Sequence, residues 1–539
     1  MVDKARSNEE LMTKNRASIL GIEYFDTSQL QNRPLFRGIL SNEDMYKIKG
    51  VVINKVGNGI VIGITSNTPQ HSIDDVKKRF QDINISYVMI STSGFEEYML
   101  LYDPPIETVY EDIELAPEGE KEKAEEISST LNQVKADDML DYILRQAWIL
   151  KASDIHLENS EDDVRIRFRV DGVLHEIANL TKDKYRQLMH SIAIAGNVST
   201  DSPKAQTGHI DYKITDEAEV PENQKKPDVR INLRIETVPA NNGQDVVMRL
   251  FHMDKSLLQL TNLGLNSQQS ALVDDVVEHP TGLVMSVGPT GSGKTTTLYS
   301  VLNALNIPTR KIITLEDPVE FTMDGVTQIP VRTGDDDTFA NKLRAVLRLD
   351  PDIVMIGEIR DVDTARTALQ ASLSGHLVLT TFHANNAPAA LSRLMDMVGE
   401  NPLFASAIRL VIAQRLVRTM EEDAREEYEP EDFMKQKLQE IIDKFPKGVE
   451  KPDVNTLKLF KPIISEERPF GYTGQTTIVE MMTMSPGIIE ILRRPVNEIT
   501  TEILEEQAQK DGMISMLQDG ILKAIAGTTT VEEVFRVVG

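Results

Sequence analysis

Eight residues near the middle of the chain have the types and spacing of a phosphate-binding loop. GPTGSGKT, residues 288–295, satisfies the pattern G-x-x-x-x-G-K-[ST] in full. Glycines let backbone N–H groups curl around phosphate oxygens, while the lysine reaches the β- and γ-phosphates and the last hydroxyl reaches Mg²⁺. The residues expected to bind the nucleotide are Gly288, Pro289, Thr290, Gly291, Ser292, Gly293, Lys294, Thr295 and Thr296.

Two clusters of carboxylates follow this loop, and each comes directly after an apolar run. KIITLEDPVEF carries Glu316, Asp317 and Glu320, and PDIVMIGEIRD carries Glu358. Phosphoryl transfer requires a carboxylate that holds the metal and a group that orients the attacking water. Because Glu358 stands where many P-loop ATPases have a metal-binding aspartate, these positions predict the metal and water sites. Surface acids at loop ends are the alternative interpretation.

A further segment, SGHLVLTTFHANNA, places His376 and His383 on either side of a strand-like run. Their spacing of seven residues is not that of a metal site, and neutral histidines commonly have structural roles. Taken alone, the two histidines indicate a structural role more than a catalytic one.

The elements that must position these side chains are those of a parallel α/β sheet. The apolar run GLVMSV before the loop predicts a buried strand, and TTTLYSVLNAL after it predicts a helix. Residues 312–315 and 353–356 predict two further strands that deliver the carboxylates. The carboxyl edge of such a sheet is where α/β proteins bind ligands.

The composition of the chain excludes several classes of site. Its 539 residues suggest about three or four domains. The absence of cysteine excludes disulfides, thiolate zinc sites and cysteine nucleophiles. A formal net charge of −26 argues against a nucleic-acid surface. No run approaches the roughly 18 apolar residues of a membrane helix, so any membrane association is expected to come through a partner.

Charge and hydrophobic patterning divide the chain into five segments. Residues 1–103 predict a small α/β domain, and residues 104–126 predict an acidic, solvated linker. Residues 127–255 predict a second α/β domain. Residues 256–400 contain the phosphate-binding chemistry, and residues 401–539 form a C-terminal subdomain with a helical tail.

Four segments resemble, in order, the Walker A, Asp-box, Walker B and His-box motifs of the secretion ATPase superfamily, which drives type II secretion and type IV pilus machines. They are GPTGSGKTTTL, TLEDPVEF, LRAVLRLDPDIVMIGEIRD and SGHLVLTTFHANNA. The flanking segments ASDIHLE, RIRFRVDGVL, VIAQRLVR and GYTGQTTIVEMM are also similar to that family. The resemblance covers roughly residues 127–539.

The resemblance implies a multidomain α/β protein that works as a homohexamer. A RecA-like P-loop ATPase domain would follow a PAS-like α/β domain and a small N-terminal α/β domain, and a helical C-terminal subdomain would end the chain. ATP and Mg²⁺ would be the cofactors. In this family, residues 1–103 would bind a partner.

The resemblance also assigns roles to single residues. Glu320 would be the general base or a carboxylate that positions the attacking water, and Thr295 and Glu358 would hold Mg²⁺ (Glu358 through water). His376 and His383 would sense the γ-phosphate or couple hydrolysis to domain movement. Arg234 and Arg249 of the second domain would supply positive charge to the transferring phosphoryl group. The motor-domain arginines at equivalent positions are Arg344, Arg348, Arg360 and Arg393.

The chain departs from the family in two places. Many members carry four cysteines between the segments that correspond to QRL and GYTG, whereas this chain has none there, so we expect no zinc site. That interval opens with the acidic run EEDAREEYEPED, residues 421–432, which predicts a solvated face. The N-terminal domain also lacks the motif with which some members bind a cyclic dinucleotide.

The function implied is an ATP-hydrolysing motor for type IV pilus or pseudopilus assembly, or type II secretion. It would act at the cytoplasmic face of the inner membrane, on a polytopic platform protein and an adaptor, without inserting into the membrane or binding nucleic acid. Pilus retraction and conjugation or DNA transfer are the alternatives within the superfamily. A scaffold that binds ATP without turnover is the alternative from another class.

Overall fold

The computed structural model describes residues 2–28, 33–57, 59–80, 83–103, 113, 121–215, 228–250, 255–331, 338–399, 402–465, 468 and 470–539. The chain forms two compact units, residues 1–109 and residues 110–539, which are described separately below. Among the described residues, no helix is long and apolar enough to cross a membrane.

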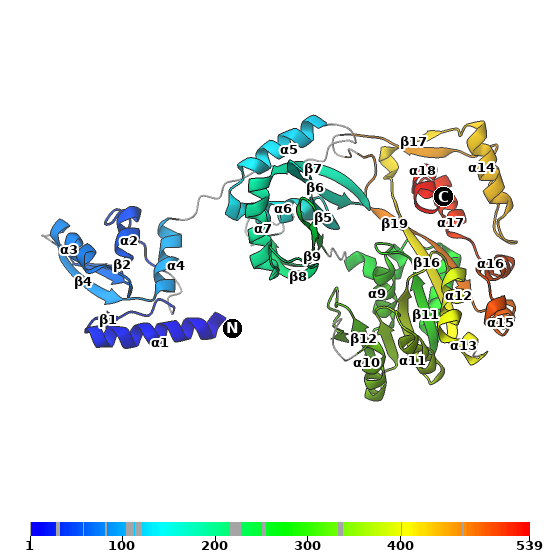
Figure 1. The fold of residues 1–539 in the computed structure, drawn as a ribbon, viewed down its shortest axis with the longest axis horizontal. Coiled ribbons are helices and arrows are strands. Elements are labelled where there is room, and N and C mark those ends of the chain that lie inside the picture. Colours follow the sequence, from blue (N-terminus) through cyan, green and yellow to red (C-terminus); the bar gives the residue numbers. More distant parts are fainter. Residues whose placement is uncertain are drawn as a thin grey trace. The chain divides into compact units, whose positions relative to one another are not determined.

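The N-terminal unit is built on a small mixed sheet (Figure 1). Its described strands are β1 (Glu23–Tyr24), β2 (Gly50–Val56), β3 (Gly59–Ile64) and β4 (Asn84–Met89), in the order β1-β4-β3-β2. Its helices are α1 (Val2–Leu20), α2 (Asn42–Ile48), α3 (Gln70–Arg79) and α4 (Thr92–Tyr102). The alternating strands and helices confirm the small α/β domain predicted from the sequence, with Ile62, Met45 and Tyr98 in its core.

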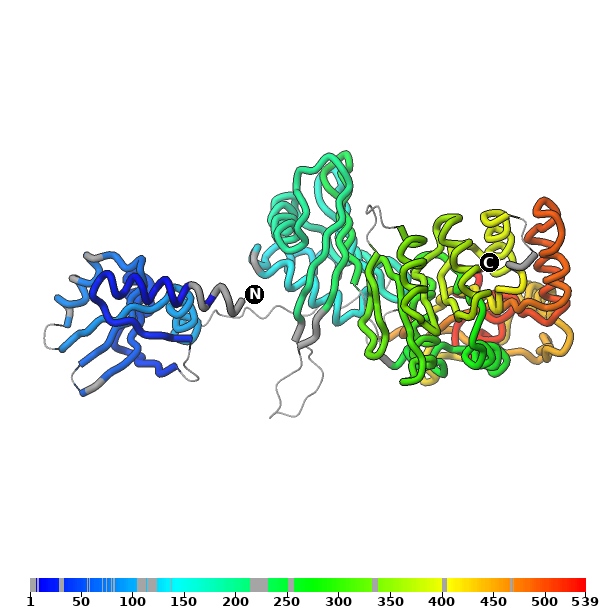
Figure 2. Tube along the Cα trace, turned by 90° about the horizontal axis from the view of Figure 1, so that it is seen from below, coloured from blue at the N-terminus to red at the C-terminus, as the bar shows by residue number. Residues whose placement is uncertain are grey.

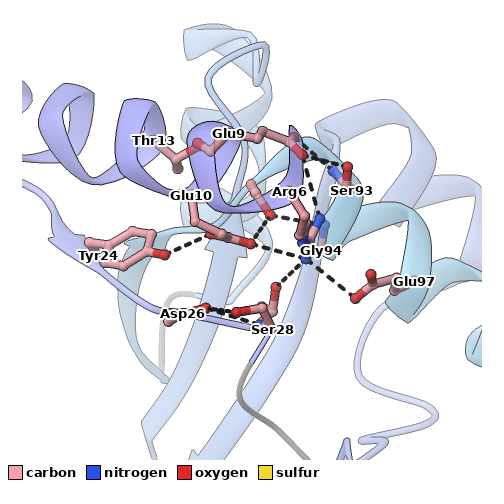
Figure 3. Close-up of polar contacts among 12 residues, drawn as sticks. Arg6, Glu9, Glu10, Thr13, Tyr24, Asp26, Ser28, Ser93, Gly94 and Glu97 are labelled. Carbon is pink, nitrogen blue, oxygen red and sulfur yellow. Dashed lines mark hydrogen bonds and ion pairs between the residues drawn. The ribbon is translucent and has the colours of Figure 1, made fainter. Parts of the chain in front are cut away.

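Helix α1 is held to this unit by charged side chains (Figure 3). Glu10 accepts hydrogen bonds from the hydroxyls of Tyr24 and Ser91 at 2.6 and 2.7 Å, and Glu9 accepts one from the backbone N–H of Ser93 at 3.1 Å. Ser91 is the N-cap of α4, so two carboxylates of α1 lie at the N-terminus of α4, where the helix dipole favours negative charge. Because the contacts that hold α1 are polar, hydrophobic periodicity in the sequence did not predict this helix.

The second unit begins with α5 (Lys121–Gln133), so the last six residues of the linker predicted at 104–126 are helical. Leu131 of α5 is buried, because the helix packs on β7 (Val173–Thr181) of the adjacent sheet. Apart from Ile113, the rest of the predicted linker lies outside the described residues.

A six-stranded antiparallel sheet follows (Figures 1 and 2). Its described strands are β5 (Asp154–Asn159), β6 (Asp163–Val170), β7 (Val173–Thr181), β8 (Gln206–Thr215), β9 (Asp228–Ala240) and β10 (Gly243–Leu250), in the order β7-β6-β5-β10-β9-β8. Alternate residues of β6 are buried against α6 (Ala136–Ile149) and α7 (Lys182–Gly196). The opposite alternation exposes a polar face that carries several arginines.

A seven-stranded sheet forms the centre of the second unit, in the order β13-β12-β14-β15-β11-β16-β19. Its described strands are β11 (Gly282–Val287), β12 (Ile312–Glu316), β13 (Val326–Pro330), β14 (Ile353–Ile356), β15 (Leu377–Phe382), β16 (Ile408–Arg418) and β19 (Gln475–Thr483). All neighbours are parallel except β16 and β19. The strands predicted at 282–287, 312–315 and 353–356 are confirmed.

Helices cover both faces of this sheet. One core contains Leu283 and Met285 with α10 (Phe339–Val346), α11 (Val362–Leu373) and α12 (Ala387–Val398). The other contains Val284 with α8 (Ser267–Glu278) and α9 (Lys294–Leu305). Strands buried on both faces explain why the sequence shows continuous apolar runs there.

The C-terminal part of the chain completes this sheet, so the domain boundary predicted after residue 400 falls inside the sheet. After α13 (Pro402–Ala407), β16 and β19 add to its edge. The intervening arm, described for residues 421–465, contains β17 (Arg425–Tyr428), α14 (Asp432–Asp443) and β18 (Leu459–Pro462). The tail contains α15 (Pro486–Leu492), α16 (Thr501–Lys510), α17 (Met516–Ile525) and α18 (Val531–Val538).

The arm and the C-terminal tail share one apolar core. Leu438, Phe445 and Leu459 are buried against Ile521 and Val534 of the tail. Among the described residues, no group of three histidine, aspartate or glutamate side chains could hold a metal ion.

The acidic run that opens the arm is partly neutralised within the arm. Lys458 and Lys461 of the β18 region pair with Glu427 and Glu426 of β17, and Arg468 pairs with Glu421. These charges are largely exposed, as the prediction of a solvated face implies.

Candidate active site

The phosphate-binding loop connects β11 to α9 and has the backbone geometry that its glycines allow. Gly293, the N-cap of α9, has a φ of 82°. A Cβ at Gly288 would lie 2.4 Å from Ser292 Oγ, so only glycine fits there. Ser292 Oγ is buried and has no hydrogen-bond partner within the described parts of the chain. The loop therefore has the form of a cradle with a polar atom left to bind a ligand.

Lys294 lies in this cradle and is held by the loop itself. Its Nζ donates to the carbonyls of Gly288 and Pro289 at 3.0 and 2.7 Å. Burial lowers the pKa of Lys294, and the nearby Glu358 carboxylate opposes that shift. A bound phosphate would place a negative charge next to this ammonium, in addition to the neutral carbonyls that it now contacts.

Gln414 of β16 supports the phosphate-binding loop through a hydrogen bond, and the sequence alone did not identify it as a site residue. This fully buried side chain donates to the carbonyl of Ser292 at 2.7 Å and accepts from the hydroxyl of Ser286 at 3.3 Å. The available signal was a polar residue inside the apolar run VIAQRLV, because a buried amide requires partners.

The first carboxylate cluster contains two glutamates in different surroundings. Glu316 is buried and accepts from the hydroxyls of Tyr299 and Thr314 and from the amide of Gln328. Glu320 is accessible from the cleft. Burial by the cleft walls and the charge of Glu316 raise the pKa of Glu320 to about 7, against the opposing effects of Arg249 and Lys294. A carboxyl that titrates near neutrality suits a general base.

The second cluster forms a chain of polar contacts across three strand ends. Glu358 follows β14, and its two oxygens contact Nε2 of His383 at 3.0 Å and Nε of Arg360 at 2.7 Å. Arg360 also lies 3.5 Å from Asp317. His383 follows β15, the neighbour of β14, so the two residues meet at the carboxyl edge of the sheet.

Charged side chains from the six-stranded sheet form a row across adjacent strands. Arg169, Asp154, Arg249 and Arg234 are directly paired neighbours on β6, β5, β10 and β9. Asp154 is only 6% exposed and accepts from Nε of Arg249 at 2.9 Å, with Nε of Arg169 at 3.3 Å. Arg234 pairs with Glu236 at 2.8 Å. The row fixes the direction of Arg249.

A cleft of about 900 Å³ brings these groups together. Its walls include residues 290–296, Glu320, Glu358 and His383 on one side, and Arg169, Arg234 and Arg249 on the other. A volume of this size is typical of small-molecule sites. Thr295 and Glu358 supply hydroxyl and carboxylate oxygens, the donors that Mg²⁺ prefers, so the residues present fit that ion.

His376 is the one predicted catalytic residue that the structure places away from the cleft. It precedes β15, whereas His383 follows it, so the two lie at opposite edges of the sheet, about 20 Å apart along the strand. Nδ1 of His376 instead hydrogen-bonds the carbonyl of Ala371 at 3.0 Å. The structure therefore places His376 too far from the cleft to sense a γ-phosphate there, and its coupling to domain movement stays a prediction.

The motor-domain arginines also separate into two groups. Arg360 lines the cleft, and Arg393 of α12 donates to the carbonyl of His383 at 2.8 Å. Arg344 and Arg348 are exposed and do not line it.

Comparisons with known proteins agree with this arrangement. A family model described as type II/IV secretion system protein matches residues 131–536. The type IV pilus assembly ATPase PilB of Myxococcus xanthus is 32% identical over 99% of this chain and 92% of its own length. Type II secretion system protein E of Xanthomonas campestris is 38% identical over 74% of this chain and 66% of its own length. That of Aeromonas hydrophila is 36% identical, over 77% and 79%.

Solved structures show the same α/β fold. The ATPase DotB of Yersinia pseudotuberculosis has a TM-score of 0.54 at 19% identity, covering 75% of this chain and 94% of that one. DotB of Legionella pneumophila has a TM-score of 0.52 at 22% identity, covering 74% and 94%. At these identities the likeness concerns the fold, and it confirms the α/β class predicted from the sequence.

Proposed function

Because this chain belongs to the type II/IV secretion system protein family, we propose that it is an ATP-hydrolysing motor that powers the assembly of a type IV pilus or pseudopilus. The observation that carries the proposal is the cleft in which the phosphate-binding loop and two strand-end glutamates face the arginines of the six-stranded sheet. Such a cleft suits phosphoryl transfer, which depends on positioning and on charge neutralisation.

In the proposed reaction, each group of the cleft has one task. Lys294 would exchange its loop carbonyls for the β- and γ-phosphates, with backbone N–H groups of residues 290–294 on the same oxygens. Glu320 would accept a proton from the attacking water as its oxygen bonds to the γ-phosphorus and ADP leaves. Arg249, held by Asp154, would neutralise charge that develops on the transferring group.

Mg²⁺ would be held by Thr295 directly and by Glu358 through water, because the oxygen donors at this edge of the sheet suit that ion. When bound, the ion supplies charge neutralisation on the phosphates. His383, through its contact with Glu358, would sense whether the γ-phosphate is present.

The family also supports a proposal for the assembly. We place the protein in a homohexamer at the cytoplasmic face of the inner membrane, held there by a polytopic platform protein and an adaptor. ATP would lie between the motor domain and the six-stranded sheet of the same or a neighbouring subunit, and closing that cleft would produce motion. Residues 1–103 would bind the adaptor.

Pilus assembly is favoured over type II secretion by the extent of similarity. The match to Myxococcus xanthus PilB covers 99% of the chain and so includes the N-terminal unit, whereas the matches to the two type II proteins cover 74% and 77%. Deleting the gene in its native host and imaging surface filaments tests the proposal. Loss of filaments is the expected result. Hyperfilamentation would indicate retraction, and intact filaments with lost secretion or DNA transfer would contradict pilus assembly.

A further inference from the structure

One buried carboxylate joins the catalytic edge of the seven-stranded sheet to the C-terminal helices. Glu480 of β19 is 5% exposed. Its Oε1 accepts a hydrogen bond from the backbone N–H of Ala387 at 2.7 Å, and its Oε2 accepts one from that of Met516 at 3.3 Å. Ala387 is the first residue of α12 and Met516 is the first residue of α17.

Both bonds are best made by the ionised carboxylate. Burial raises the pKa of Glu480 to about 7, and the two backbone N–H groups oppose that shift. The first N–H groups of a helix have no partner within the helix, and its N-terminus favours negative charge. Each oxygen of Glu480 satisfies one such group on a different helix, 129 residues apart along the chain. A glutamine of the same shape has one acceptor oxygen, and its amide nitrogen can only donate, so it can serve one helix but not both.

The α12 end of this bridge leads to the cleft. His383 lies four residues before Ala387, and the segment between them is held at two more points. Arg393 donates to the carbonyl of His383 at 2.8 Å, and Arg415 donates to that of Asn385 at 3.0 Å. Because Arg393 itself lies on α12, a shift of α12 at Ala387 would also displace the carbonyl of His383, and with it the contact between His383 and Glu358.

The α17 end leads to the arm. Ile521 and Ala524 of α17 share a core with Leu438 of α14, Leu459 of β18 and Val534 of α18. A shift at Met516 would therefore be transmitted through packed side chains to the arm and tail.

We propose that Glu480 is a positioning residue that sets the location of His383 and couples the nucleotide cleft to the C-terminal helices. This inference rests on the proposed ATPase function. Neither the motifs of the P-loop nor the arginine row requires such a residue.

A double-mutant cycle on kcat tests this role. The variants are Glu480→Gln, His383→Ala and their combination. We expect Glu480→Gln to lower kcat about five- to tenfold with the KM for ATP unchanged within about twofold, and to have no further effect when His383 is already alanine.

Asp519→Asn is the matched control. Asp519 is equally buried and lies on α17. It accepts hydrogen bonds from the backbone N–H of Val479 at 2.9 Å, from Nε2 of Gln269 at 2.9 Å and from Nζ of Lys523 at 2.8 Å, and within the described part of the chain it has no bond to α12. This variant should lower the melting temperature, and any effect that it has on kcat should be the same whether His383 is present or replaced by alanine. Equal effects of Glu480→Gln in both backgrounds, an unchanged kcat, or the same non-additivity for Asp519→Asn would overturn the assignment.

Hydrogen exchange on the wild-type protein gives a second test, which does not depend on whether a variant folds. On binding a non-hydrolysable ATP analogue, peptides covering residues 383–390 and residues 515–520 should change protection together. A change in the first peptide alone would also refute the coupling. A wild-type protein that binds the analogue but hydrolyses no ATP would instead contradict the proposed function, and the exchange result would still stand.

Discussion

At the scale of single residues, the cleft separates two glutamates by their surroundings. Glu320 faces the cleft near Glu316 and Lys294, and its pKa of about 7 leaves it able to exchange a proton near neutral pH. Glu358 instead has both oxygens occupied, by His383 and Arg360. The difference supports the proposed role of Glu320 as the base, and it places His383, the proposed sensor, in contact with Glu358.

The pKa of Glu320 leads to a pH dependence of hydrolysis. Because a base must be deprotonated, kcat/KM for ATP, which reports on the free enzyme, should fall about tenfold per unit as the pH drops below about 7. Steady-state rates between about pH 8 and pH 5.5 measure this. The residual rate of Glu320→Gln should lack the dependence over that range. A flat wild-type profile would show that another group is the base.

Lys294 should be required for binding itself. Lys294→Ala removes the one ammonium in the phosphate cradle, and we expect ATP affinity to fall by about a hundredfold or more, because a charge-assisted contact to phosphate is lost. Equilibrium binding of a fluorescent ATP analogue measures the loss. Lys510→Ala, an exposed lysine at the end of α16, is the control with the same change in charge and should bind normally.

At the scale of elements, the sequence predicted those parts whose signal is local. Each strand of the seven-stranded sheet that carries site residues is a continuous apolar run, and the loop and carboxylates lie where those runs end. The sequence also contained the reason why His376 and His383 cannot both contact one γ-phosphate. Two residues that bracket one strand lie at opposite edges of a sheet, so both could not reach one phosphate.

Other elements could not be found from the sequence because their contacts are distant or polar. Helix α1 packs through Glu9 and Glu10, and its apolar Met12 and Ile19 are 71% and 83% exposed, the reverse of the usual amphipathic pattern. Gln414 and Glu480 act through partners that lie 36 or more residues away, which no local motif records.

The arm should be stable without any metal, because an apolar core takes the place of a zinc site. Treating the protein with a strong zinc chelator should leave the melting temperature unchanged. Leu459→Ala should instead destabilise the C-terminal transition by about 2–5 kcal/mol, since Leu459 is fully enclosed. Calorimetry compares the two. A chelator-dependent transition, or an unaffected Leu459→Ala protein, would contradict this view of the arm.

At the scale of the whole second unit, the cleft is complete only because two sheets contribute to it. The seven-stranded sheet supplies the loop and the carboxylates, and the six-stranded sheet supplies Arg249 and Arg234. Neither sheet alone has both the phosphate cradle and the positive charge opposite it, so relative movement of the two would control hydrolysis.

This shared cleft leads to a prediction on Arg249. Arg249→Ala should lower kcat at least about tenfold and change the KM for ATP much less, because charge is needed most as the phosphoryl group transfers. Arg165→Ala is the control, since Arg165 lies on the same sheet but pairs with Glu158 at 2.9 Å and does not line the cleft. Equal kcat values for the two variants would remove Arg249 from the mechanism.

The central claim is that this cleft hydrolyses ATP. Its most direct test is the Mg²⁺-dependent ATPase rate of the wild-type protein and of Glu320→Gln, with ATP binding measured for both. We predict that both bind ATP and that the variant hydrolyses it at least about a hundredfold more slowly. A wild-type protein that binds ATP without turnover, or a variant that turns over at the wild-type rate, would contradict the account.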